Sequence, residues 1–136
     1  MRAELAESEA KGEIAAIYAE VRRLCAVPYV SSLQRHLATR PGWLEWAWAA
    51  IGPAFRSGAA QQTAWRLADG LGLPPLAPVP AAALSVWGVA PADLPAVRAA
   101  CESFVRVSPT NMVFAALLKA LLGGARPGGQ RPGADA

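Results

Sequence analysis

The chain has 136 residues, 54 % of them hydrophobic and 17 % charged, a length that fits one domain and leaves no room for a second. The formal net charge is only +3 and the basic residues are dispersed, which excludes the clustered basic surface of a nucleic-acid-binding protein. Because small domains need proportionally more polar surface, so apolar a composition predicts burial in an oligomer beyond the chain's own core.

The first part of the chain predicts the opening helices of an all-α domain. Apolar residues at helical spacing, with acids early and arginines late, predict an amphipathic helix over residues 9–25. A short second helix is expected to end at Arg40, before the helix-breaking pair Pro41-Gly42. Its polar face offers candidate functional side chains, namely Ser32, Gln34, Arg35 and His36.

The third predicted helix runs from Pro41 toward Phe55 and carries Trp43, Trp46 and Trp48. Apolar residues occupy nearly its whole circumference, and such a helix is normally buried on more than one side. A twin subunit could cover the second side, because monomers seldom expose apolar patches of that size.

The remaining chain predicts three further helices, about six in all. Residues 60–71 predict the fourth helix, and the uncharged stretch 70–92 contains five prolines, too many for a membrane span, so it predicts a long connecting loop. Residues 93–107 predict a fifth helix whose inward side chains are Leu94, Val97, Cys101, Phe104 and Val105.

A new helix start is predicted at Ser108, with Ser108 as the cap and Pro109 at the first helical position. The sixth helix would then extend from Met112 to Leu122 and stop at Gly123. We therefore divide the chain into an N-terminal lead (1–11), one helical repeat (12–124) and a disordered Gly/Pro tail (125–136).

The two cysteines, Cys25 and Cys101, lack metal-ligand or redox spacing and predict core thiols in a reducing compartment. The N-terminus MRAELAESEA contains acids and no apolar segment, so it does not resemble a signal peptide, and we expect a cytoplasmic protein. There is neither a Gly-rich phosphate loop nor an HExxH motif, so we expect no metal and no cofactor.

Two polar pairs lie four residues apart on predicted helices. Ser32 and His36 have the spacing of an activated nucleophile, although such pairs are also common on solvated helix faces. Glu102 and Arg106 predict a surface ion pair; alternatively, Arg106 faces an anionic ligand held at the start of the last helix. Asn111, in the first turn predicted there, could orient a water molecule or a substrate oxygen.

Three segments carry a family resemblance: "VPYVSSLQRHLATRPG", a glycine-bounded "QQTAWRLADGLGLPP" and "FVRVSPTN". Together they resemble the group I 2-haloacid dehalogenases, or halocarboxylic acid dehydrogenase family, over residues 12–122. The resemblance implies an all-helical fold in which two repeats, each about as long as this chain, pack as a pseudo-dimer around one active site. A single-repeat chain is then expected to form a homodimer that binds a small carboxylic acid.

The resemblance also implies a chemistry, hydrolysis of 2-halo carboxylic acids of either hand by direct attack of water. An aspartate activates that water and an asparagine helps to hold it. The aspartate position corresponds to Leu33, and the asparagine position to Ser108, with Asn111 three residues on. No acid occurs between Glu20 and Glu45, so this chain lacks the base of the implied mechanism.

Three hypotheses follow from this loss. The chain could be a dehalogenase with His36 as a substitute base, because imidazole takes up protons near neutral pH. It could bind a small organic acid without turnover, or act only as a dimerisation module; a heterodimer with an aspartate-bearing partner is a further alternative. The candidate catalytic residues are His36 and Asn111, and the candidate pocket residues are Tyr29, Ser32, Leu33, Trp48, Arg106 and Ser108.

Overall fold

The computed structural model describes residues 3–123, and every regular element in that range is helical, which confirms the all-α class. Six α-helices occur there. One of them, α5, lies within the loop predicted for residues 70–92, and the fifth and sixth predicted helices form a single continuous helix, α6. The elements in chain order are η1 (Glu7–Glu9), α1 (Gly12–Cys25), α2 (Ser32–Leu37), α3 (Trp43–Arg56), α4 (Ala59–Asp69), α5 (Ala81–Val86), η2 (Pro91–Asp93) and α6 (Leu94–Leu121).

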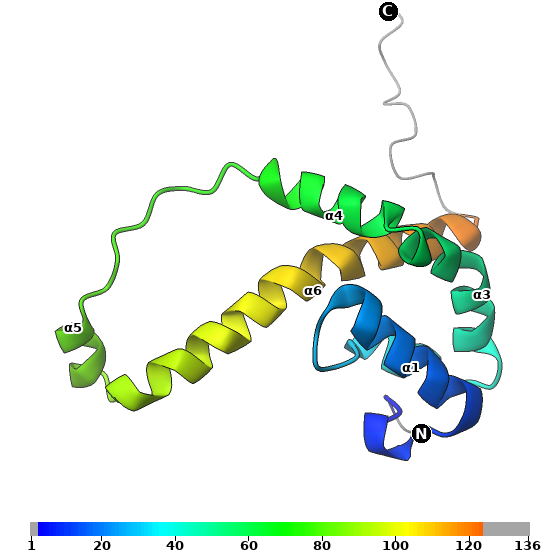
Figure 1. Ribbon diagram of the computed structural model, residues 1–136, viewed down its shortest axis with the longest axis horizontal. Coiled ribbons are helices and arrows are strands. Elements are labelled where there is room, and N and C mark those ends of the chain that lie inside the picture. The colour runs from blue at the N-terminus through cyan, green and yellow to red at the C-terminus, as the bar shows by residue number, and fades with distance from the viewer. Residues whose placement is uncertain (1–2, 124–136) are drawn as a thin grey trace, which may run out of the picture.

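The core lies where α1, α3 and α4 pack around the second half of α6, residues 107–121, and these parts form the body of the molecule (Figure 1). Helix α3 buries one stripe there, formed by Leu44, Ala47, Trp48, Ile51 and Phe55. Trp43 and Trp46, on its other side, are 41 % and 44 % exposed. The predicted apolar circumference is therefore only half covered within a single chain.

Aromatic rings join α3 to α6 at the centre of this core. The Trp48 ring centroid lies 5.7 Å from that of Phe55, and the Phe114 centroid lies 6.4 Å from Trp48 and 6.3 Å from Phe55. All three residues are buried. Aromatic pairs at these separations add to the stabilisation that burial alone provides, so they fix the second half of α6 against the body.

A carboxylate joins α1 to α3 beside the aromatic cluster. Glu20 accepts hydrogen bonds from the Trp48 indole at 2.8 Å and from the Arg56 guanidinium at 2.6 and 3.0 Å. The Arg56 guanidinium in turn lies 5.7 Å from the Trp48 ring centroid. The hydrogen bonds from Arg56 and then Trp48 favour the ionised carboxylate and lower the pKa of Glu20 to about 2.

The N-terminal segment is part of the fold through contacts with α1 and α2. The Leu5 amide donates to the Arg35 carbonyl at 2.9 Å, and the Leu5 carbonyl accepts a hydrogen bond from Tyr18 at 3.1 Å. Glu4 pairs with Arg35 at 3.0 Å, and Glu7 pairs with Arg22 at 2.7 Å. Residues 3–10 thus connect α1 to α2.

The predicted helix start at Ser108 is wrong, because α6 continues through this position for 28 residues with Pro109 in its interior. Proline removes one backbone hydrogen bond there, which favours a break locally. However, Val107 and Thr110 are buried on either side, and the Thr110 hydroxyl donates to the Val107 carbonyl at 2.8 Å. Burial against the body therefore overrides the local signal.

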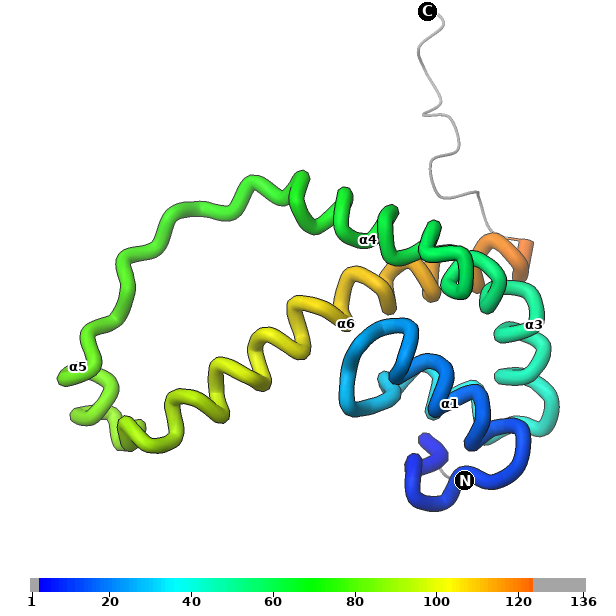
Figure 2. The backbone as a smooth tube through the Cα atoms, viewed as in Figure 1, coloured from blue at the N-terminus to red at the C-terminus, as the bar shows by residue number. Residues whose placement is uncertain are grey.

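The other half of α6 extends away from the body together with α5 (Figure 1). We call residues 70–106 the arm; it includes the connection that follows α4, α5, η2 and the first half of α6. That connection runs well apart from α6 along much of its length (Figure 2). No residue from 65 to 106 is buried in the described chain.

The inward stripe predicted for residues 93–107 is therefore wrong for a single chain. Val97 is 51 % exposed, Phe104 60 % and Val105 65 %, and Cys101 is also exposed. Cys101 is thus not a core thiol, whereas Cys25 is partly buried. The apolar periodicity is present, but no residue of this stripe is buried within the described chain, although Phe104 lies against Tyr29.

By length and composition alone, the stretch Pro91–Leu121 would be able to cross a membrane. The core helices of soluble proteins pass the same test. Its second half packs in the core through Val113, Phe114 and Leu118, which accounts for the apolar composition of that half.

The Glu20 contacts predict a pH-dependent stability. Replacing Glu20→Gln removes the charge that Arg56 and Trp48 hydrogen-bond, and should lower the free energy of unfolding by about 1–2 kcal/mol near neutral pH. Because the folded pKa lies below the ordinary value of 4.5, this contribution is present above about pH 4.5 and is lost as the pH falls toward 2.

Urea unfolding of both proteins at several pH values measures this difference, with Glu13→Gln on the exposed face of α1 as the control. Equal stability of wild type and Glu20→Gln at pH 7 would contradict the account.

Candidate functional site

A hollow of about 450 Å³, bordered by several polar side chains, lies where the arm joins the body. It forms between α6 and the segment that leads into α2, and we call it the basal hollow. Its volume falls in the range of small-molecule sites. The lining residues are Tyr29, Val30, Ser31, Ser32, Arg35, Phe104, Val107, Ser108 and Asn111.

The segment that leads into α2 is held in place from both ends. Helix α1 ends at Cys25, and Ala26 follows with a left-handed φ of 53° that reverses the chain. The Val27 amide then donates to the Arg22 carbonyl at 3.1 Å. Val30 is buried, and its amide donates to the Glu7 carboxylate, which also holds Arg22. The N-terminal segment thereby positions Tyr29 and Ser31 on either side of Val30.

Polar side chains connect α2 to α6 at the base of the hollow. Ser31 hydrogen-bonds the side-chain carbonyl of Gln34, and its hydroxyl lies 2.9 Å from Oδ1 of Asn111. The Gln34 amide also donates to that Asn111 oxygen, at 3.4 Å. Since Gln34 is buried, this network lets α2 pack on α6 without leaving its amide unpaired.

Tyr29 also lines the hollow, and its hydroxyl forms no hydrogen bond within the described residues. The hydroxyl is buried. Burial raises the pKa of this phenol, so it stays protonated and able to donate. The ring lies against that of Phe104, with centroids 5.9 Å apart. A buried donor of this kind is available to a guest molecule.

Arg35 supplies the only formal charge among the nine residues of this lining. One of its terminal nitrogens pairs with Glu4, and its Nε is buried without a partner in the described chain. The lining contains no Asp or Glu. Hydroxyl, amide and guanidinium groups without a facing carboxylate suit a ligand that is anionic or carries a carbonyl. None of these groups accepts a proton readily near neutral pH, so the lining lacks a general base.

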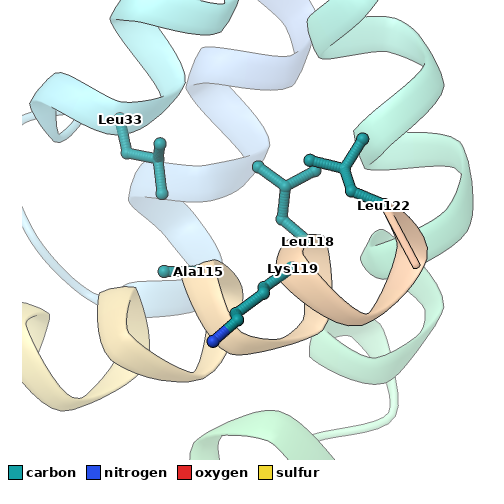
Figure 3. A pocket seen from close by; sticks show the side chains of 5 residues that line it. All are labelled: Leu33, Ala115, Leu118, Lys119 and Leu122. Carbon is teal, nitrogen blue, oxygen red and sulfur yellow. The ribbon is translucent and has the colours of Figure 1, made fainter. Parts of the chain in front are cut away.

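Four of the predicted site residues meet in the basal hollow: Tyr29, Ser32, Ser108 and Asn111. Leu33 lies elsewhere, on a separate hollow of about 350 Å³ where it faces α6 (Figure 3). That lining is apolar apart from Lys119. The position that resembles the family's aspartate therefore holds an apolar side chain among apolar neighbours.

His36 also lies apart from Asn111. Its Nδ1 is 2.7 Å from the Ala3 carbonyl, an interaction in which the imidazole must donate, and it lines a third hollow with Glu4 and Arg40. Trp48 is buried in the core, with its indole donating to Glu20, so it forms no wall of the basal hollow.

Arg106 is exposed on the arm and is absent from the described lining of the hollow. The helix start that was expected to hold an anion beside it does not form. Ser108 and Asn111 reach the hollow from the middle of α6 instead.

The sequence pattern does not indicate the network contacts of Ser31 and Gln34, nor the contacts of the acids in the N-terminal segment. The spacing of Ser31 and Gln34 fits a capping box, in which each side chain would bond a backbone amide. In the structure the two side chains bond each other and Asn111, and Ser31 makes no capping bond. The contacts of Glu4 and Glu7 depend on the tertiary fold, and no local pattern indicates them.

The polar network predicts a stability effect at Asn111. Asn111→Ala removes an acceptor of the buried Gln34 amide and should lower the free energy of unfolding by about 1–3 kcal/mol, although alanine favours the helix. Urea unfolding measures the change, and Gln62→Ala, at an exposed amide on α4, is the matched control. A loss no larger than that of Gln62→Ala would show that the network does not stabilise the α2–α6 contact.

No family model matches the chain, and no curated protein matches it in sequence. Among solved structures, it is similar to a D-2-haloacid dehalogenase mutant in complex with D-2-CPA, with a TM-score of 0.63 and 21 % sequence identity. The match covers 96 % of this chain and 47 % of that one, so the chain spans about half the length of the dehalogenase. At this identity the comparison shows a shared fold, and the chain is a distant structural relative of the dehalogenase.

Proposed function

We propose that the chain is a dehalogenase-like protein that binds small 2-halo or 2-hydroxy carboxylic acids in the basal hollow without hydrolysing them. The observation that carries the proposal is the convergence of donors on a lining without carboxylates. Tyr29 offers a buried hydroxyl with no partner in the described chain, and Ser31, Ser108 and Asn111 add polar groups from the two facing elements.

A carboxylate fits the electrostatics of this hollow. It accepts hydrogen bonds from hydroxyl and amide groups, and Arg35 contributes a positive charge that Glu4 only partly offsets. Phe104 and Val107 provide an apolar part of the lining, which suits a short alkyl group or a halogen substituent. Because Arg35 already has an acidic partner, we expect modest affinity.

Hydrolysis lacks its base. Leu33 cannot take a proton from water, and it lies on a different hollow from Asn111. His36 is the substitute that the sequence suggested, but it lines a third hollow and is bonded to the N-terminal segment. Loss of a general base usually lowers a rate by a factor on the order of 100 to 10,000, so binding without turnover is favoured over hydrolysis.

Ligand binding is tested with isothermal titration of 2-chloropropanoate and lactate, and with 2-chloropropanamide as the uncharged control. We expect both acids to bind and the amide to bind at least about tenfold more weakly, because it lacks the charge that Arg35 attracts. Binding of the amide as tightly as the acids would contradict recognition of a carboxylate.

Two tyrosine variants separate binding from stability. Tyr29→Phe removes a hydroxyl without a partner in the described chain, so it should weaken binding of 2-chloropropanoate by about fivefold and leave stability unchanged. Tyr18→Phe removes the bond to the Leu5 carbonyl, so it should lower stability and leave affinity unchanged. Equal affinity of Tyr29→Phe and wild type would exclude the hydroxyl from the site.

Halide release from both enantiomers of 2-bromopropanoate tests hydrolysis, with an active two-repeat dehalogenase as the control. We expect no release above the uncatalysed rate. Release by the wild type but not by His36→Ala would establish a dehalogenase with a relocated base and would overturn binding without turnover.

A further inference from the structure

We infer that the N-terminal segment, residues 3–10, is an internal competitor of the ligand, because Glu4 pairs with the Arg35 guanidinium that lines the basal hollow. Local opening of residues 3–5 and binding of a carboxylate then favour each other. The inference rests on the proposed function, since it takes the basal hollow as the ligand site.

Arg35 is shared between the N-terminal segment and the basal hollow. Its side chain lines the hollow, and its Nε is buried without a partner in the described chain. One of its terminal nitrogens lies 3.0 Å from the Glu4 carboxylate. A guanidinium carries one positive charge, so a carboxylate that already offsets it repels a second carboxylate nearby. Glu4 and an anionic ligand therefore compete for the same charge, even where they contact different nitrogens.

Residues 3–5 are attached to α2 by contacts that can open locally. The Leu5 amide donates to the Arg35 carbonyl at 2.9 Å, and Nδ1 of His36 donates to the Ala3 carbonyl at 2.7 Å. None of these three residues of the segment is buried, and all three line the hollow of about 400 Å³ that contains His36. Partly exposed contacts of this kind break at low cost, so residues 3–5 can detach while the body stays folded.

A second anchor in the same segment keeps the basal hollow in shape when residues 3–5 detach. Glu7 pairs with Arg22 of α1 at 2.7 Å and accepts a hydrogen bond from the Val30 amide. Val30 is buried and lines the hollow. The two acids therefore have opposite effects, since Glu7 supports the ligand site and Glu4 opposes the ligand.

The exposure of the Glu4–Arg35 pair sets the size of the effect. The Arg35 side chain is 32 % exposed and that of Glu4 35 %, so water screens their attraction. Loss of such a pair costs the fold little, whereas the released positive charge becomes available to the ligand. We expect the affinity for a monocarboxylate to rise about fivefold when Glu4 loses its charge.

Isothermal titration of 2-chloropropanoate into matched glutamine variants tests the competition. Glu4→Gln keeps the size of the side chain and removes its charge, so it should bind the acid about fivefold more tightly than wild type. Glu7→Gln makes the same chemical change but weakens the anchor at Val30, so it should bind the acid more weakly. Glu13→Gln, exposed on α1, should match wild type, and circular dichroism should show that all four proteins are folded.

Hydrogen exchange of the Leu5 amide measures the same coupling from the other side, because coupling between two binding events is reciprocal. Saturating 2-chloropropanoate should speed exchange of this amide in wild type about fivefold, whereas 2-chloropropanamide at the same concentration should not. In Glu4→Gln the amide should exchange faster without ligand, and the acid should add little.

Three results would overturn the inference: equal affinity of Glu4→Gln and wild type, tighter binding by Glu7→Gln as well as by Glu4→Gln, or a Leu5 exchange rate that the acid does not change. Tighter binding by both variants would show a general effect of removing negative charge.

The two proposals fail differently. If wild type and Glu4→Gln bind the acid equally, the competition is refuted and the ligand site stands. If neither protein binds it, the proposed function is refuted and the competition with it. Binding by Glu4→Gln alone would support the competition in its strongest form.

Discussion

Phe114 packs against the rings of Trp48 and Phe55, and this buried aromatic contact determines where α6 lies on the body. Because α6 is continuous through Pro109, the contact that fixes its second half also sets the direction of its first half. The position of Asn111 against α2, the mouth of the basal hollow and the projection of the arm all follow from it. Glu20 supports the same arrangement by joining α1 to α3 beside Trp48.

The sequence predicts the helices of the body well because their patterns are local. Spacing, charge order and the Pro41-Gly42 break locate α1, the end of α2 and α3 to within a few residues. It fails at Ser108, where a strong local start signal competes with burial of Val107 and Thr110. It also fails on the arm, because apolar periodicity indicates a face suited to packing and does not show whether the chain itself buries that face.

The candidate site is only partly predictable for the same reason. Tyr29, Ser32, Ser108 and Asn111 follow from motifs near the ends of expected helices, and they meet in one hollow. Leu33 and His36 are neighbours of Ser32 and Arg35 in sequence, but successive residues of a helix point in different directions, so they line other hollows. The part played by Glu7, which holds the Val30 amide, arises from tertiary contact alone.

The central claim is that the buried contact of Phe114 with Trp48 and Phe55 fixes α6 on the body. Hydrogen exchange of the backbone amides in residues 107–121 tests this most directly, by comparing wild type with Phe114→Ala. The account predicts slow exchange in wild type and a rise in the variant that is larger for these amides than for those of α1. A rise no larger in residues 107–121 than in α1 would contradict it.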